Sequence, residues 1–172
     1  MNHIKPVISW IIVLWTCKVF LFSLPYKFSG HPDTQHIFGT IGQWISDTLL
    51  EPLGSFFTQF GAYAVGTFEL ITSIILLLPA LLWVLNKTGL RKSGSSRQRL
   101  HAIGGLLASA VMVGAVFFHL FTPLGIEVLH NGKSDGGSLF YAAVSILVLG
   151  IVLFLLNSKG LFNTQSPEPT VR

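Results

Sequence analysis

The chain has 172 residues and a formal net charge of +4; 51% of its residues are hydrophobic and only 10% are charged. Soluble domains have about 25% charged residues, and a soluble fold of this length could not bury so much apolar surface. The composition therefore excludes an ordinary soluble domain and indicates an integral membrane protein whose outer faces contact lipid.

Four apolar runs, residues 7–24, 62–85, 102–121 and 139–156, are long enough to cross a membrane as helices. Each covers about 27 Å or more at about 1.5 Å per residue, close to the thickness of the hydrocarbon core. The first run lacks the small-residue cleavage site of a signal peptide, so we expect it to be retained. The sequence predicts an all-α, integral membrane four-helix bundle. Residues 1–160 form its single membrane domain, and residues 161–172 form a disordered cytoplasmic tail.

Residues 25–61 separate the first two runs and contain a further helical pattern. Pro32 and Asp33 are typical of a first helical turn, and Pro52 marks a break further along. Between them, apolar residues recur at helical spacing with polar residues on the other side. We expect an amphipathic helix on the outer surface of the bundle, with an ordered loop as the alternative. The apolar positions are Ile37, Ile41, Trp44, Ile45 and Leu49.

The distribution of basic residues predicts the orientation of the four helices. Residues 86–100 join the second and third runs and carry five basic residues, whereas each connection on the opposite side carries one. Under the positive-inside rule this loop and both termini face the cytoplasm, and the acidic outer connections face the opposite side. Orientation and anionic lipid account for the positive charge, so no nucleic-acid partner is expected. The five are Lys87, Arg91, Lys92, Arg97 and Arg99.

Glu69 is the only charged residue in the second apolar run. A carboxylate at the centre of a bilayer costs about 2.5–3.5 kcal/mol, so it must face the bundle, form a pair or be protonated. Lys18, the only charge in the first run, lies at a similar depth when the two helices are counted from Leu24 and Ala62. Two alternatives stay open: Lys18 pairs with Glu69, or it extends to the outer headgroups.

His119 lies near the outer end of the third run, on a stripe of small residues. We expect it to join Lys18 and Glu69 in a buried polar cluster in the outer half of the bundle, although a structural role is the alternative. Small residues let helices approach closely, either within the bundle or against a second copy of the chain. The expected packing positions are Gly66, Gly105, Ala108 and Gly114.

The outer connections contain His31, Asp33, Glu127 and His130 as further candidate contributors to a site. Glu127 and His130 would be credible metal ligands only if His31 or Asp33 joined them in space, so no metal site is predicted. Cys17 is the single cysteine, which excludes an internal disulfide. No nucleotide-binding or hydrolase motif is present, and no catalytic residue is assigned.

Several stretches resemble the DoxX family of small bacterial membrane proteins. "GTFELITSIILLLP" (66–79) resembles the second helix of that family. "VMVGAVFFHLFTPLGIEVLHNGKSDGGSLFYAAVSILVL" (111–149) resembles its third helix, outer loop and fourth helix. "YKFSGHPDTQHIFGTIG" (26–42) and "EPLG" (51–54) resemble its outer segment, although Leu53 replaces a more usual aromatic residue. The resemblance implies a four-helix protein of the bacterial cytoplasmic (inner) membrane, singles out Glu69 and His119, and associates the chain with membrane redox assemblies.

Two functional hypotheses follow. In the first, the chain is an accessory subunit of a membrane redox assembly. Its outer polar cluster binds a quinone or a small anion, or relays protons, and a soluble or membrane oxidoreductase supplies electrons. In the second, it is a non-catalytic scaffold or a carrier of a small lipid-soluble molecule, and the buried charges fix helix register. Quinone is the only candidate cofactor. A transporter would require internal repeats, which the two halves do not share.

Overall fold

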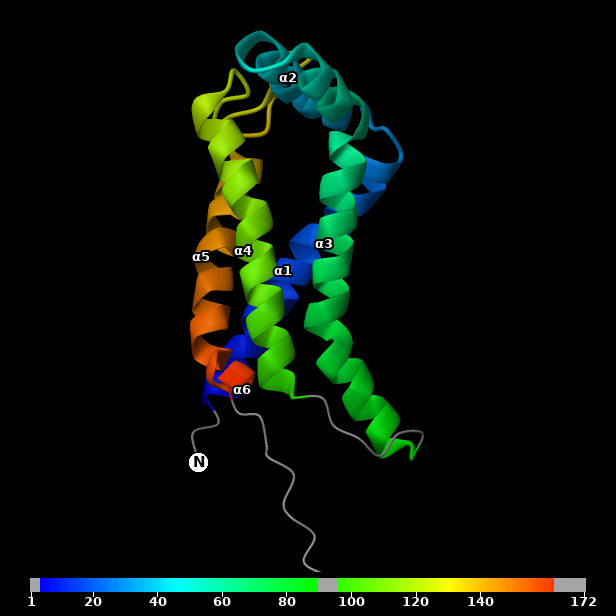
Figure 1. Ribbon diagram of the computed structural model, residues 1–172, viewed down its shortest axis with the longest axis vertical. Helices are drawn as coiled ribbons and strands as arrows, with labels where there is room; N and C mark the ends of the chain where they lie inside the picture. The colour runs from blue at the N-terminus through cyan, green and yellow to red at the C-terminus, as the bar shows by residue number, and fades with distance from the viewer. Residues whose placement is uncertain (1–3, 90–95, 163–172) are drawn as a thin grey trace, which may run out of the picture.

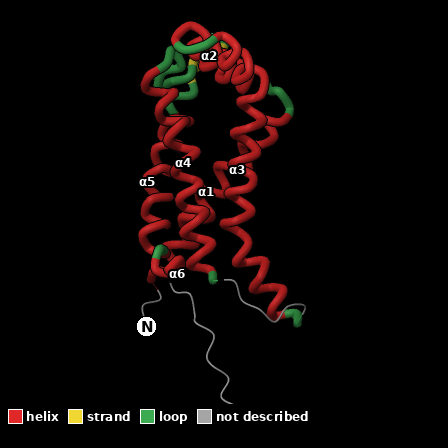
Figure 2. Tube along the Cα trace, viewed as in Figure 1, coloured by secondary structure: helices red, strands yellow, loops and turns green. Residues whose placement is uncertain are grey.

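The computed structural model describes residues 4–89 and 96–162, and these are almost entirely helical (Figure 2). Of the predicted tail, residues 163–172 lie outside the described residues. The elements in chain order are α1 (Ile4–Phe28), α2 (Pro32–Thr48), α3 (Glu51–Lys87), α4 (Arg97–Phe121), β1 (Leu129–His130), β2 (Lys133–Ser134), α5 (Ser138–Asn157) and α6 (Lys159–Phe162).

Four of these helices, α1, α3, α4 and α5, are long and apolar enough to cross a membrane. They run along the long axis of the molecule, and α1 crosses it from beside α5 at the lower end to beside α3 at the upper end (Figure 1). This agrees with the predicted all-α bundle. We call the lower end, where α1 and α4 begin, the basic end, and the upper end, where α2 lies, the capped end.

Two of the long helices extend beyond their predicted spans at the capped end. The first helix continues through Pro25 to Phe28, and α3 already begins at Glu51, with Pro52 in its first turn. Proline is tolerated in the first turn because the amide hydrogen that it lacks would have no helical partner there. These longer helices change which side chains meet at the capped end.

The amphipathic helix predicted between the first two spans is confirmed as α2. Its N-terminus is capped by His31, whose Nδ1 accepts a hydrogen bond from the backbone N–H of Asp33 at 3.3 Å. Its apolar face packs on the loop after α4 and covers the upper end of the bundle (Figure 1). The cluster that holds it there contains Ile41, Ile45, Leu124 and Val128.

The contact between α2 and α3 depends on two glycines. A Cβ atom at Gly42 would lie 2.7 Å from the carbonyl oxygen of Gly54, closer than a real Cβ atom comes. A Cβ atom at Gly54 would likewise meet the carbonyl oxygen of Gly42. The two backbones therefore touch directly, and this contact fixes α2 against the first turns of α3.

A short hairpin joins α4 to α5 at the capped end. In it β1 pairs with β2 in antiparallel register, and Asn131 and Gly132 at the turn have φ angles of 51° and 74°. Both angles suit the two-residue Asn-Gly turn that connects β-strands with the usual twist. The Asn131–Gly132 pair of the sequence therefore forms the turn of this hairpin.

Asp135 fastens this hairpin to the start of α5. Burial by itself would raise the pKa of the carboxyl group, but it accepts hydrogen bonds from the backbone N–H groups of Leu139, Val128 and Gly137 and from the hydroxyl of Ser138. These bonds favour the charged form and hold the pKa below its ordinary value. The first N–H groups of a helix have no partner within the helix, and at the start of α5 the charged Asp135 accepts hydrogen bonds from such groups.

The closest interface between long helices joins α4 and α5. A Cβ atom at Gly105 would lie 2.7 Å from the carbonyl oxygen of Gly150, and Ser109 donates a hydrogen bond to the carbonyl of Leu147 at 3.0 Å. Ala108 is buried in the same interface. Gly66 lies instead under the ring of Phe28.

Gly114 does not pack as predicted. A Cβ atom built there would meet nothing within 4 Å, because this position faces open space inside the bundle rather than a neighbouring helix. The correction matters because Gly114 lines the cavity described next.

Candidate functional site

Glu69 is buried at the capped half of the bundle, with 3% of its surface exposed. Its Oε2 atom lies 2.8 Å from the ammonium nitrogen of Lys27, whose side chain is 15% exposed. The same oxygen lies 2.8 Å from the hydroxyl of Ser23, and Lys27 also donates to that hydroxyl at 2.8 Å. The three groups form a closed triangle between α1 and α3 that neutralises the carboxylate.

Of the two alternatives for Lys18, a pair with Glu69 is wrong. Lys18 is exposed, and its ammonium nitrogen lies 5.7 Å from the centre of the Trp15 ring. The partner is Lys27, nine positions further along α1, which is about two and a half turns at about 3.6 residues per turn. Lys18 and Lys27 therefore lie on opposite faces of α1, and only Lys27 faces α3.

The two oxygens of Glu69 have different roles. Lys27 and Ser23 both bind Oε2, and among the described residues no hydrogen bond is made to Oε1. Glu69 also lines a cavity. Oε1 is therefore the atom of this carboxylate that is available to a molecule bound there.

The cavity has a volume of about 230 Å³ and lies under α2, between the four long helices. Its walls are mainly apolar, and its polar side chains come from Ser23, Lys27, Glu69 and His119. Small residues on α4 and α5 create the space. Those small residues are Gly114, Ala115, Ala142 and Ala143, while Ile37, Phe38 and Ile41 of α2 close the upper side.

His119 is buried, with 7% of its surface exposed, and lines the same cavity as Glu69. Its Nδ1 atom lies 2.6 Å from the carbonyl oxygen of Gly125. Because a carbonyl oxygen only accepts hydrogen bonds, Nδ1 carries a proton and donates it to Gly125; when the ring is neutral, Nε2 is then an acceptor. Glu69 and His119 thus line one cavity, and Ser23 and Lys27 are the partners of Glu69 in place of the predicted Lys18.

The outer histidines form a separate group between the first turns of α2 and the hairpin. His130 binds Asp33 at 2.6 Å, and its ring stacks on His36 at a centroid distance of 4.6 Å. The hydrogen bond from His130, followed by the charge of His31, lowers the pKa of Asp33. This contact ties the N-terminus of α2 to the hairpin, so these residues position the cover of the cavity.

Glu127 does not complete a metal site with these residues. Its carboxylate accepts a hydrogen bond from the hydroxyl of Ser134 at 2.8 Å, within the hairpin. In the part of the chain that the structure describes, histidine, cysteine, aspartate and glutamate side chains form no group of three or more that could hold a metal ion.

The chain was compared with protein-family models, with curated proteins and with solved structures, and none of these matches it. The function is therefore argued from the geometry of the cavity.

Proposed function

We propose that the chain is a multi-pass protein of the bacterial cytoplasmic membrane, with its basic end in the cytoplasm and its capped end outside. Four helices of spanning length support this. So do the large apolar side chains on their outer faces, where Ile11, Leu14, Phe22 and Leu155 are each more than 60% exposed. Exposing so much apolar surface to water is unfavourable, whereas the apolar lipid tails of a bilayer can cover it.

This orientation predicts a difference in labelling between the two ends. In a chain with Cys17→Ala, single cysteines are introduced at Ser96, on the basic end, and at Ser134, in the hairpin; both positions are exposed. A membrane-impermeant maleimide is expected to label the cysteine at 134 in intact cells and the cysteine at 96 only after lysis. Labelling of both positions in intact cells would contradict the orientation.

The cavity at the capped end is proposed to bind the ring of a quinone, with the chain acting as an accessory, DoxX-like subunit of a membrane redox assembly. The volume of about 230 Å³ supports a single ring. An engineered cavity of about 150 Å³ already admits benzene, whereas pockets for drug-sized molecules start at about 300 Å³. In this proposal a partner oxidoreductase supplies the electrons, because the single cysteine cannot form a redox-active disulfide within the chain.

The polar atoms at the cavity suit a ring with oxygens at both ends. Lys27 is a donor, whereas Oε1 of Glu69 and Nε2 of neutral His119 are acceptors. A quinone carbonyl can accept from Lys27, and the hydroxyl groups of a quinol can donate to Glu69 and His119. The single observation that carries the proposal is that Lys27, Glu69 and His119, together with Ser23, border a cavity whose other walls are mainly apolar.

Binding is tested with a short-chain benzoquinone added to the purified protein, followed by extraction and quantification of retained quinone. Gly114→Phe is expected to abolish retention because its ring enters the cavity, where a side chain at this position meets no atom within 4 Å of Cβ. Ala110→Phe is the matched control on the same helix, since Ala110 is exposed and does not line the cavity.

A wild-type protein that retains no benzoquinone, or equal retention by both phenylalanine variants, would overturn the quinone proposal. The second candidate is a carrier or scaffold without redox function, and the mutual saturation of Ser23, Lys27 and Glu69 at Oε2 favours it. Under that hypothesis a lipophilic ring without oxygens, such as toluene, is retained as well as the quinone.

A further inference from the structure

A second polar cluster lies buried at the basic end and links three helices. Ser9, His101 and Asn157 are almost inaccessible, with 0%, 0% and 2% of their surfaces exposed. The amide of Asn157 donates to the hydroxyl of Ser9 at 2.9 Å. The guanidinium of Arg97 lies 3.4 Å from both Oδ1 of Asn157 and Nδ1 of His101. The cluster therefore holds Arg97 in a fixed position.

The partners of Arg97 leave its charge uncompensated. A guanidinium group only donates hydrogen bonds, so Nδ1 of His101 accepts one from Arg97. The His101 ring is therefore neutral. Asn157 is neutral as well. Both contacts use the same nitrogen, Nη1. Within residues 4–89 and 96–162, no other side chain forms a hydrogen bond with the remaining N–H groups of Arg97.

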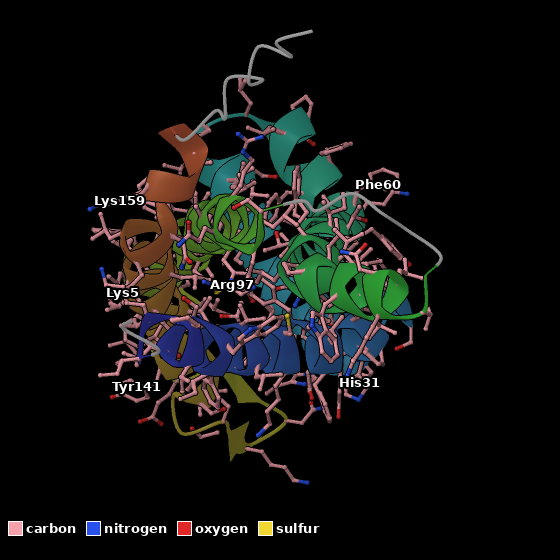
Figure 3. The ribbon with its side chains drawn as sticks, turned by 90° about the horizontal axis from the view of Figure 1, so that it is seen from below. Lys5, His31, Phe60, Arg97, Tyr141 and Lys159 are labelled. Atoms are coloured by element: carbon pink, nitrogen blue, oxygen red, sulfur yellow. The ribbon has the colours of Figure 1, made fainter. Side chains whose placement is uncertain are left out.

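Arg97 borders a second cavity, which lies at the basic end and has a volume of about 460 Å³. The last turns of α3, after Pro79, lean away from the start of α4 (Figure 1), and this cavity lies between them. Viewed from below, Arg97 lies near the middle of this end, whereas Lys5 and Lys159 lie at its edge (Figure 3). The other lining residues are Trp10, Pro79, Ala80, Leu82, Trp83 and Asn86.

The charges of the described residues favour an anion in this cavity. The carboxylates of the described chain belong to α2, α3 or the connections at the capped half, and none of them pairs with a basic side chain of the basic end. The described cations at this end are Lys5, Lys87, Arg97, Arg99 and Lys159, with Lys87 lying over the ring of Trp83 at 4.8 Å.

We propose that this cavity binds the phosphate of an anionic phospholipid. Arg97 donates to the phosphate oxygens, as guanidinium groups do in fork geometry, and the amide of Asn86 adds a further donor. Trp10 and Trp83 lie where indole rings prefer the membrane interface, and Leu82 continues the wall toward the acyl chains. Basic pockets between helices on the cytoplasmic side commonly bind such headgroups. The inference rests on the proposed membrane insertion but not on the quinone cavity.

The test is a competition between phosphatidylglycerol and phosphatidylcholine for the detergent-solubilised protein, with the bound lipids counted by native mass spectrometry. The wild type is expected to prefer phosphatidylglycerol, and Arg97→Gln to lower that preference about fivefold, the factor that one cation near an anionic lipid contributes. Arg99→Gln is the matched control because Arg99 is exposed and does not line the cavity. Ala80→Phe fills the cavity without touching the polar cluster and should lower the preference like Arg97→Gln.

If Arg97→Gln and Arg99→Gln lowered the preference for phosphatidylglycerol equally, general surface charge would explain the effect. That result would overturn the proposed site. A wild type that binds both lipids equally would do the same. Inorganic phosphate is added as a separate competitor; displacement of phosphatidylglycerol at millimolar phosphate would assign the site to a free anion instead of a lipid. Flotation with vesicles reports membrane insertion independently, so a failure of insertion is distinguished from a failure of headgroup recognition.

Discussion

Replacing Lys27 by methionine is expected to lower the free energy of unfolding by about 3–5 kcal/mol, the usual cost of removing one partner of a buried ion pair. The loss arises because Glu69 is 3% exposed and keeps only the hydroxyl of Ser23 as a partner on Oε2. Glu69→Gln is expected to cost a similar amount, since it leaves the ammonium group of Lys27 without its counter-ion. Thermal unfolding in detergent measures both losses.

The double variant Lys27→Met, Glu69→Gln is expected to recover most of the stability, because replacing both partners removes the uncompensated charge. Lys18→Met is the matched control on the same helix, since Lys18 is exposed and lies over Trp15. It should leave the unfolding temperature almost unchanged. If the losses of the two single variants simply added in the double variant, Lys27 and Glu69 would not be energetically coupled. Their contact would then contribute nothing to the free energy of unfolding.

The same double variant separates the two functional hypotheses. A stable double variant that no longer retains benzoquinone would assign the charges to ligand binding. A stable double variant that still retains it would restrict the charges to fixing the register of α1 against α3.

The sequence predicted the long helices because apolar runs of this length have few alternative structures. It failed at Lys27 because the first span was ended at Leu24, where the apolar run stops, whereas α1 continues to Phe28. In addition, the depth of Glu69 was counted from Ala62, the first residue of the predicted second span, although α3 begins at Glu51. Helix ends are set by tertiary contacts, and ending the first helix at Leu24 left Lys27 outside it, so that Lys18, on the opposite face of α1, was taken as the partner.

The cavity could be predicted only in part. A buried carboxylate and a histidine among small residues indicated a polar site between helices, and both Glu69 and His119 line the cavity. The sequence predicted a helix on the outer surface that partly caps the bundle, but not the contact that ties it to the hairpin, because Asp33 meets His130 97 positions later in the chain. The cluster around Arg97 was missed for a similar reason: Ser9, His101 and Asn157 come from three separate helices and have no shared spacing.

Small residues gave a mixed result that has one physical explanation. A glycine on a membrane helix creates either a close contact or an empty space, and the sequence is the same in both cases. Gly105 creates a contact with the backbone of Gly150, and Gly114 creates part of the cavity. The partner helix decides between the two outcomes.

This difference gives the second large expected effect. Gly105→Ala should destabilise the protein by about 1–3 kcal/mol, the typical cost of overpacking. Its new Cβ atom would lie 2.7 Å from the carbonyl oxygen of Gly150 and 3.0 Å from the backbone nitrogen of Phe154. Backbone atoms cannot move aside by changing rotamer, so α4 and α5 must separate. The same separation would lengthen the bond of 3.0 Å between the hydroxyl of Ser109 and the carbonyl of Leu147.

Gly114→Ala makes the identical chemical change on the same helix and should have the opposite effect. Nothing lies within 4 Å of its new Cβ atom, so the favourable helix propensity of alanine, about 1 kcal/mol relative to glycine, is not offset by a clash. Thermal unfolding of the two variants should therefore shift in opposite directions from the wild type. A stabilising Gly105→Ala would show that α4 and α5 are further apart than described here. A strongly destabilising Gly114→Ala would show that the cavity is filled by packing and has no room for a ligand.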